Sequence, residues 1–217
     1  KVSRDGRQIE VELRKGVKFS DGHPFDASDV VFTFETYLDP ASRSPQRDLL
    51  LLHGKPVQVK MLGSHKLRFD LPEPYAVAER LFDSVAILPR HLLEPAAKAK
   101  RIHEVWTLNS KPAEIAGLGP FRFKSNVPGS KIELERNPHY WKTDPKGTQL
   151  PYLDTLEFLA AGSEDNQTLR FLSNETQILN RVGSKAFELL EKQAPGDRLQ
   201  DLGASLEYNF LFFNLSS

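Results

Sequence analysis

The sequence predicts a mixed α/β (α+β) fold, and three stretches carry that prediction. Residues 9–13 alternate apolar and charged side chains with a period of two, which is typical of a half-buried strand. Residues 26–38 open with an acidic capping pattern and continue with apolar residues at helical spacing. Residues 208–215, YNFLFFNL, form an almost continuous apolar run, as expected of a strand covered on both faces.

The part before residue 116 is predicted to contain both strands and helices. A turn at SDGHP (residues 20–24) precedes a helix capped by Asp26, and Asp29 stands three residues later, close to a capping-box pattern. Both acids suit the positive end of the helix dipole. The other predicted elements are an irregular loop over 40–46, a hairpin of strands 57–62 and 66–71, and helical stretches over 75–82, 91–100 and 102–108.

The pattern changes to strands after GLGP at residues 117–120. Alternation predicts strands beginning at Phe121, over 131–135 and over 156–159, with a turn at PG (128–129) between the first two. Helices are predicted over 164–172 and 185–193, with Ser163 and Ser184 at their capping positions.

Composition excludes several classes of protein. The 29 basic and 29 acidic residues give zero net charge, which argues against nucleic-acid binding. The absence of cysteine excludes disulfides, thiolate nucleophiles and Cys-ligated zinc. No apolar run approaches the roughly 20 residues of a membrane helix. Both ends of the chain look cut, so the missing signal peptide is uninformative.

No catalytic or metal-binding motif stands out. The six histidines include no pair at i, i+4 and no HExxH, and the chain has neither GxSxG nor a phosphate-binding glycine loop. We interpret the acidic pair Glu164 and Asp165 as the first turn of a helix. The phenylalanines are mostly core candidates, although periodicity alone does not separate core from pocket. The sequence therefore predicts no enzyme, no cofactor and no metal.

Three stretches, taken in order, resemble one known family. They are LRKGVKFSDGHPFDASDVVFTF (13–34), the stretch from 66 to ILPRH (87–91), and GLGPFRF (117–123) with PG and IELERNPHYW (132–141). Together they are similar to family 5 of the bacterial extracellular solute-binding proteins, the peptide, dipeptide and nickel binding proteins of ABC importers. The chain departs from that pattern at Leu118, at Phe121 and at NETQ (174–177), where the local turn is in doubt.

The resemblance implies a periplasmic-binding-protein-like lobe with a smaller inserted α+β domain, incomplete in this chain. Residues 1–115 correspond to the smaller insert domain and residues 116–217 to part of the first large lobe. The second large lobe, which in the family supplies much of the pocket, is absent.

The function implied is capture of a peptide or other small solute between two lobes that close by a hinge motion. The expected partner is an ABC permease in the membrane, and the expected location is periplasmic or extracellular, with or without a lipid anchor on the full-length protein. We expect a monomer that binds no nucleic acid. Asn214, Phe212 and Tyr208 are the predicted ligand-binding residues, although Asn214 equally fits a strand end that bonds its own backbone. The predicted hinge residues are Gly117, Gly119 and Pro120.

Two other functions remain open at the level of sequence. One is a sensing or interaction module in which the same lobes signal to a partner. The other is a glycosidase using Glu133 and Glu135, although alternation with Ile132 and Leu134 indicates that these carboxylates lie on the solvent face of a strand.

Overall fold

The computed structural model describes residues 1–75, 77–83, 85–179 and 182–193. The chain divides into two compact units, Lys1–Leu159 and Ala160–Ser217. Both helices and strands occur along it, which confirms the predicted mixed fold. The predicted division near residue 116 falls inside the first unit and remains a prediction about the domains of the whole protein. Within the described ranges, no helix is long and apolar enough to cross a membrane.

The first unit begins with an antiparallel sheet in the order β1-β5-β4. Its strands are β1 (Gln8–Glu12), β4 (Gln58–Gly63) and β5 (Lys66–Asp70), so the predicted hairpin is confirmed. Ile9 pairs with Phe69, and both point into the core, where they are 4% and 3% exposed. The opposite face carries ion pairs such as Lys66 Nζ to Glu10 Oε2 at 2.9 Å. The period-two alternation in the sequence thus separates a buried face from a charged one.

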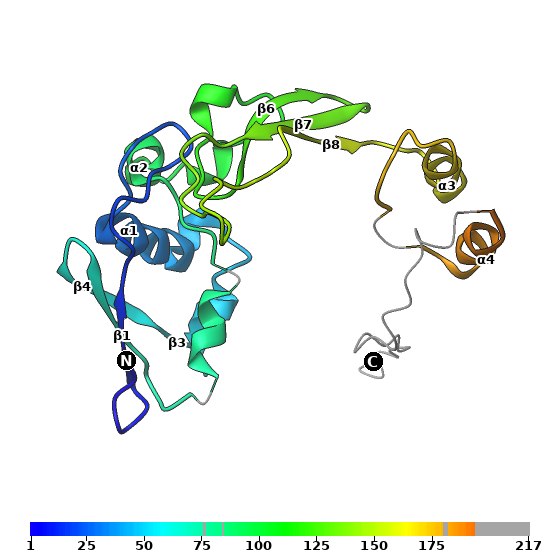
Figure 1. Ribbon diagram of the computed structural model, residues 1–217. Helices are drawn as coiled ribbons and strands as arrows, with labels where there is room; N and C mark the ends of the chain where they lie inside the picture. Colours follow the sequence, from blue (N-terminus) through cyan, green and yellow to red (C-terminus); the bar gives the residue numbers. More distant parts are fainter. Residues whose placement is uncertain (76, 84, 180–181, 194–217) are drawn as a thin grey trace, which may run out of the picture. The chain divides into compact units, whose positions relative to one another are not determined.

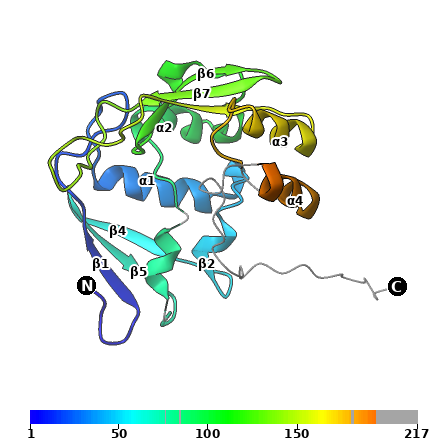
Figure 2. The same cartoon turned by 45° about the vertical axis from the view of Figure 1, so that its right-hand side comes forward.

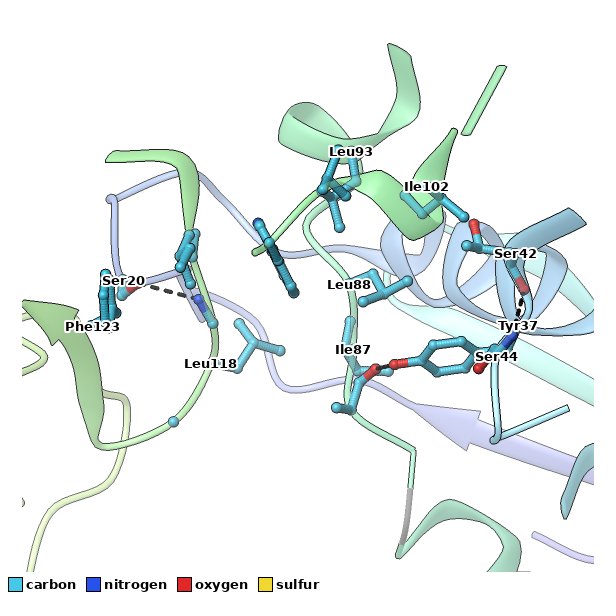
Figure 3. A pocket seen from close by; sticks show the side chains of 18 of the residues that line it. Ser20, Tyr37, Ser42, Ser44, Ile87, Leu88, Leu93, Ile102, Leu118 and Phe123 are labelled. Carbon is cyan, nitrogen blue, oxygen red and sulfur yellow. Dashed lines mark hydrogen bonds between the residues drawn. The ribbon is translucent and has the colours of Figure 1, made fainter. Parts of the chain in front are cut away.

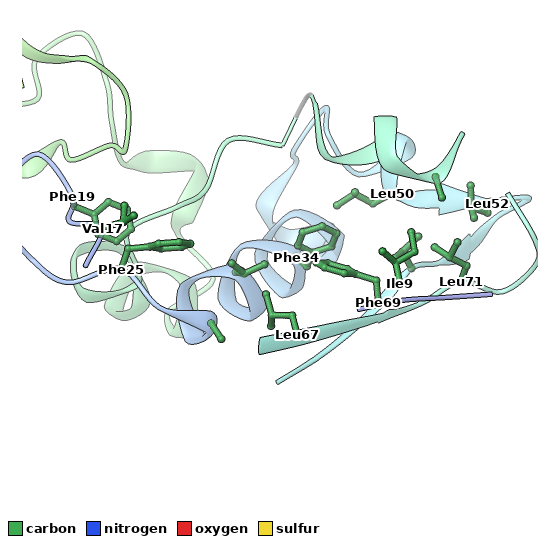
Figure 4. Close-up of a cluster of buried hydrophobic side chains, with 14 of the residues drawn as sticks. Ile9, Val17, Phe19, Phe25, Phe34, Leu50, Leu52, Leu67, Phe69 and Leu71 are labelled. Atoms are coloured by element: carbon green, nitrogen blue, oxygen red, sulfur yellow. The ribbon is translucent and has the colours of Figure 1, made fainter. Parts of the chain in front are cut away.

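Helix α1 (Ala27–Leu38) packs on this sheet, and both views show it between the sheet and α2 (Figure 1, Figure 2). The predicted cap is confirmed, because Asp26 accepts from the Ser28 N–H and Asp29 accepts from the Asp26 N–H. Phe34 is 2% exposed, and its ring lies 5.2 Å from the ring of Phe69. Figure 4 shows Phe34, Phe69, Leu67 and Ile9 in one cluster between helix and sheet.

The other face of α1 holds an extended segment, residues 86–90, through three side chains. Asp29 Oδ1 accepts from the Arg90 N–H at 3.1 Å, Thr33 Oγ1 accepts from the Leu88 N–H at 2.9 Å, and the Tyr37 hydroxyl donates to the Ala86 carbonyl at 2.8 Å. Four helical residues rise about 6 Å, and two extended residues span about 6.6 Å. These two lengths are nearly equal. Side chains at positions i, i+4 and i+8 of the helix therefore lie beside every second residue of an extended segment that runs in the opposite direction. We refer to these three hydrogen bonds as the α1 ladder.

A second antiparallel sheet in the order β6-β7-β8 completes the first unit. It consists of β6 (Phe121–Val127), β7 (Lys131–Arg136) and β8 (Thr155–Leu159), joined between β6 and β7 by the predicted turn at Gly129, whose φ is 70°. One face is apolar, with Phe123 opposite Leu134 and Leu134 opposite Leu156. The other face carries paired charges.

Two predicted helices differ from the structure. The stretch predicted over 75–82 contains a short 3-10 helix, Ala78–Phe82, because its backbone bonds join residues three apart, as from the Arg80 N–H to the Val77 carbonyl. The stretch predicted over 102–108 is helical only over Ile102–Glu104, because Trp106 has a φ of 55°, outside the right-handed helical region. Helix α2 itself (Arg90–Lys98) lies close to its predicted range.

The remaining short elements of the first unit lie in its loops. They are the strands β2 (Leu51–Leu52) and β3 (Lys55–Pro56) and the 3-10 helices Pro40–Ser42, Asp48–Leu50 and Pro112–Glu114.

The second unit contains helices α3 (Glu164–Leu172) and α4 (Ser184–Gln193), which pack on each other. Ser163 caps α3 as predicted, accepting from the Asn166 N–H at 3.2 Å. Ser184 is the first residue of α4 and not the residue before it, so its predicted capping position is one residue too late. The predicted strand over 208–215 lies outside the described residues.

We expect Thr33→Val to lower the free energy of unfolding by about 1–3 kcal/mol, because it leaves the buried Leu88 N–H without an acceptor. Urea unfolding of the intact protein measures this. Thr36→Val is the matched control: Thr36 lies on the same helix, and its buried hydroxyl has no hydrogen-bond partner in the described structure. An equal loss in both variants would contradict the role given to the α1 ladder.

Candidate functional site

A cavity of about 870 Å³ opens in the first unit, beside the α1 ladder. Its walls come from the C-terminal half of α1 with the loop after it, segment 86–88, the stretch 102–106, the crossover 115–119 and the start of β6. Figure 3 shows Tyr37, Ile87, Leu88, Leu93 and Leu118 around it. Most lining side chains are apolar, which suits a small-molecule site.

The crossover that leads from the first sheet region to β6 is fixed on both sides. Gly117 exchanges two hydrogen bonds with Ser20: its carbonyl accepts from the Ser20 N–H at 2.9 Å, and its N–H donates to Ser20 Oγ at 3.2 Å. Asn137 Nδ2 donates to the Gly119 carbonyl at 2.8 Å, and the Asn137 N–H donates to the Pro120 carbonyl at 2.9 Å. Asn137 is fully buried, so these bonds are shielded from water.

Aromatic groups form much of the cavity wall. Burial raises the pKa of the Tyr37 hydroxyl, which stays a hydrogen-bond donor to Ala86. Trp106 Nε1 donates to the Glu114 carbonyl at 2.7 Å, so its polar atom is satisfied while its ring lines the cavity. Phe121 and Phe123 are only half-buried and also line the cavity, whereas Phe34 is core. The structure thus separates the aromatic residues that periodicity could not.

The polar groups of the cavity are few. Ser42 Oγ donates to the Asp39 carbonyl at 2.8 Å and accepts from the Ser44 N–H at 3.2 Å. The Thr36 hydroxyl is buried without a partner among the described residues, at a point where it borders this cavity and a smaller one of about 270 Å³. A buried hydroxyl of this kind is available to a ligand.

Two histidines stack beside the Ser20 turn, next to the crossover. The rings of His23 and His91 lie 3.8 Å apart at 16°, and His91 Nε2 lies 2.7 Å from Asp21 Oδ2. Burial acts to raise the pKa of Asp21, but the hydrogen bonds to His91 and to the His23 N–H outweigh it and hold that pKa below its usual value. Across the described part of the chain, no three His, Cys, Asp or Glu side chains are placed to hold a metal ion.

The carboxylates considered for glycoside hydrolysis are held in ion pairs. Arg122 Nη2 lies 2.7 Å from Glu135 Oε1, and Lys124 pairs with Glu133. The hydrogen bond from Lys124 holds the pKa of Glu133 below its usual value, the opposite of what a general acid requires. Glu164, the first residue of α3, accepts from the N–H of Gly183, the residue before α4, in keeping with a structural role.

The structure brings part of the predicted site together. Gly117 and Gly119 line the cavity, and Pro120 follows them. Tyr208, Phe212 and Asn214 lie outside the described residues. Sequence reasoning missed the contributions of Arg43 and Trp106; both have positive φ values, 51° and 55°, which no sequence pattern indicated.

Residues 1–217 match the model of the bacterial extracellular solute-binding proteins, family 5. The chain therefore belongs to this family of binding proteins, whose members act in the periplasm or outside the cell. That membership confirms the predicted resemblance and the periplasmic-binding-protein-like fold.

Individual relatives are named for different solutes. The chain is 32% identical to the oligopeptide-binding protein AppA of Bacillus subtilis over 94% of its length, and 29% identical to a periplasmic alpha-galactoside-binding protein of Rhizobium meliloti over 96%. A solved structure of Bacillus subtilis AppA with a nonapeptide has a TM-score of 0.71 at 28% identity, covering 89% of this chain. The chain spans only 35% of the AppA sequence, 32% of the alpha-galactoside-binding protein and 36% of the chain in the AppA structure.

We expect Asp21→Asn to destabilise the protein by about 1 kcal/mol at pH 7, by weakening a charged hydrogen bond. The pKa of Asp21 is lower in the folded state than in the unfolded state, where it is near 3.8. The contribution of Asp21 to the free energy of unfolding is therefore present above the unfolded-state pKa and is lost as the pH falls through the folded-state pKa. Urea unfolding at a series of pH values from 7 downwards should show the stability difference between the two proteins shrinking as the pH falls below about 3.8. Asp83→Asn, at an exposed position, is the control, and a difference that stays constant as the pH falls would refute the assignment.

Proposed function

We propose that the protein is the solute-binding component of an ABC import system and has no enzymatic activity. The observation that carries this proposal is the match of residues 1–217 to one family of binding proteins. The first relative, from Deinococcus radiodurans, is named a probable ABC transporter-binding protein. Ion pairing of Glu133 and Glu135 also argues against the hydrolase alternative.

A peptide-like solute with apolar side chains fits the cavity better than a sugar. Its volume of about 870 Å³ lies within the range of about 300–1,000 Å³ for small-molecule sites. A sugar presents many hydroxyl groups, each of which needs a hydrogen-bond partner when buried. The cavity offers few, because Tyr37, Ser42 and Trp106 are already bonded within the protein.

The mechanism we propose is capture between two lobes, followed by delivery to a membrane permease. The cavity would form part of one wall, and Tyr208, Phe212 and Asn214 remain proposed ligand contacts from the strand over 208–215. Closure would bury the solute and present the closed surface to the permease. The protein would act as a monomer in the periplasm or outside the cell, held at the membrane by a lipid anchor on the full-length protein, with no cofactor and no nucleic-acid partner.

The direct test is a thermal-shift series on the full-length protein with di- to hexapeptides, oligosaccharides and nickel. We expect peptides with apolar side chains to raise the melting temperature, because a ligand that binds only the folded state stabilises it by mass action, about 2.7 kcal/mol at 100 times Kd. A shift with oligosaccharides alone would move the solute class to sugars. No shift with any solute would contradict the peptide assignment.

The proposed hinge at Gly117 and Gly119 yields a separate prediction. Neither glycine has a positive φ, and a Cβ at Gly117 would meet nothing within 4 Å. We therefore expect Gly117→Ala and Gly119→Ala to change the free energy of unfolding by less than about 1 kcal/mol while weakening solute binding in calorimetry, because alanine restricts the bend. Unchanged binding would rule out the hinge.

Gly22→Ala provides the contrast in stability. Gly22 has a φ of 90°, and a Cβ there would lie 3.3 Å from His139 Nε2. A cost of about 1–3 kcal/mol is expected at such a position.

A further inference from the structure

The ionisable side chains that line the cavity are all bases, apart from the phenol of Tyr37. They are Arg43, His103 and Arg122, and among the residues that the structure describes no aspartate or glutamate lines it. A cavity with apolar walls and only cationic groups favours a ligand that is apolar over most of its surface and carries a negative charge.

Two of these three bases are already near a carboxylate. Arg122 Nε and Nη2 both lie 2.7 Å from Glu135 Oε1. His103 Nε2 lies 3.8 Å from Glu104 Oε1, and protonation would be needed to charge it. The Arg43 guanidinium, by contrast, makes no hydrogen bond and no ion pair within the described ranges, and Arg43 is exposed.

The backbone around Arg43 is held by local hydrogen bonds, so the side chain starts from a defined point beside the cavity. Arg43 has a φ of 51°, and its N–H donates to the Pro40 carbonyl at 3.2 Å. Ser42 before it is 8% exposed and bonds both Asp39 and Ser44, and Figure 3 shows Ser42 and Ser44 at the end of the cavity near Tyr37. A binding group on a fixed turn loses less entropy when it meets its ligand.

We propose that the cavity selects solutes in which a carboxylate is joined to an apolar group, and that Arg43 binds that carboxylate. This inference rests on the proposed solute-binding function and names the solute class. Arginine is charged at all working pH values, and its planar fork matches a carboxylate with two parallel hydrogen bonds. Two sources have this chemistry: the carboxyl terminus of an apolar peptide and a free aliphatic acid.

The test is calorimetry on the full-length protein with matched pairs of probes. Trileucine is compared with trileucine amide, and octanoate with octanamide, so that each pair differs in the charge of one group. We expect the acid of at least one pair to bind about tenfold more tightly than its amide, with the preference falling as salt is raised, because Arg43 is exposed. Preference within the trileucine pair alone assigns the peptide terminus, and within the octanoate pair alone the free acid.

Arg43→Gln should reduce the acid-to-amide ratio to about one while leaving amide binding unchanged. Arg4→Gln is the matched control, because Arg4 is exposed and does not line the cavity, and it should keep the tenfold ratio. A ratio that survives Arg43→Gln overturns the assignment to Arg43. Equal binding of acid and amide overturns the solute class while leaving solute binding intact, whereas binding of neither pair contradicts the proposed function for apolar solutes and this inference with it.

Discussion

The α1 ladder is the constraint on which the rest of the first unit depends. Helix α1 buries one face against the first sheet and uses another to bond segment 86–90 through Asp29, Thr33 and Tyr37. An extended segment that is not part of a sheet has backbone groups that need partners. The helix supplies them at the matching spacing, so one element positions both the core and the cavity wall.

Two sets of hydrogen bonds hold the crossover between the sheets, which completes the cavity wall. Ser20 binds Gly117, and Asn137 binds Gly119 and Pro120, so the segment is held by residues distant from it in sequence. Asn137 belongs to a motif that the sequence identified only by resemblance. Asn137 is fully buried and bonds the backbone of the crossover, so the physical role of that motif is to hold the crossover in place.

Charged and apolar side chains lie on opposite faces of the second sheet, and this arrangement makes the cavity wall apolar. The face with Arg122, Glu133 and Glu135 pairs its charges, while the face with Phe123 and Leu134 continues the apolar wall of the cavity. Glu133 and Glu135 lie on the face opposite Phe123 and Leu134, and neither is among the described residues that line the cavity. The bases that remain at the cavity include one, Arg43, whose charge is not matched by a neighbour in the described structure.

The sequence by itself determined the elements governed by local patterns: the capped helix α1, the hairpin of β4 and β5, and the strands β6 to β8. These depend on side-chain periodicity and capping, which act over a few residues. Only the tertiary structure decided which aromatic residues form core and which line the cavity, since periodicity assigns Phe34 to a helix and Phe121 to a strand without saying how deeply either is buried. The tertiary structure also decided the positive φ of Trp106 and the exposure of Arg43. Long-range packing sets both, and the neighbouring residues in the sequence do not encode that packing.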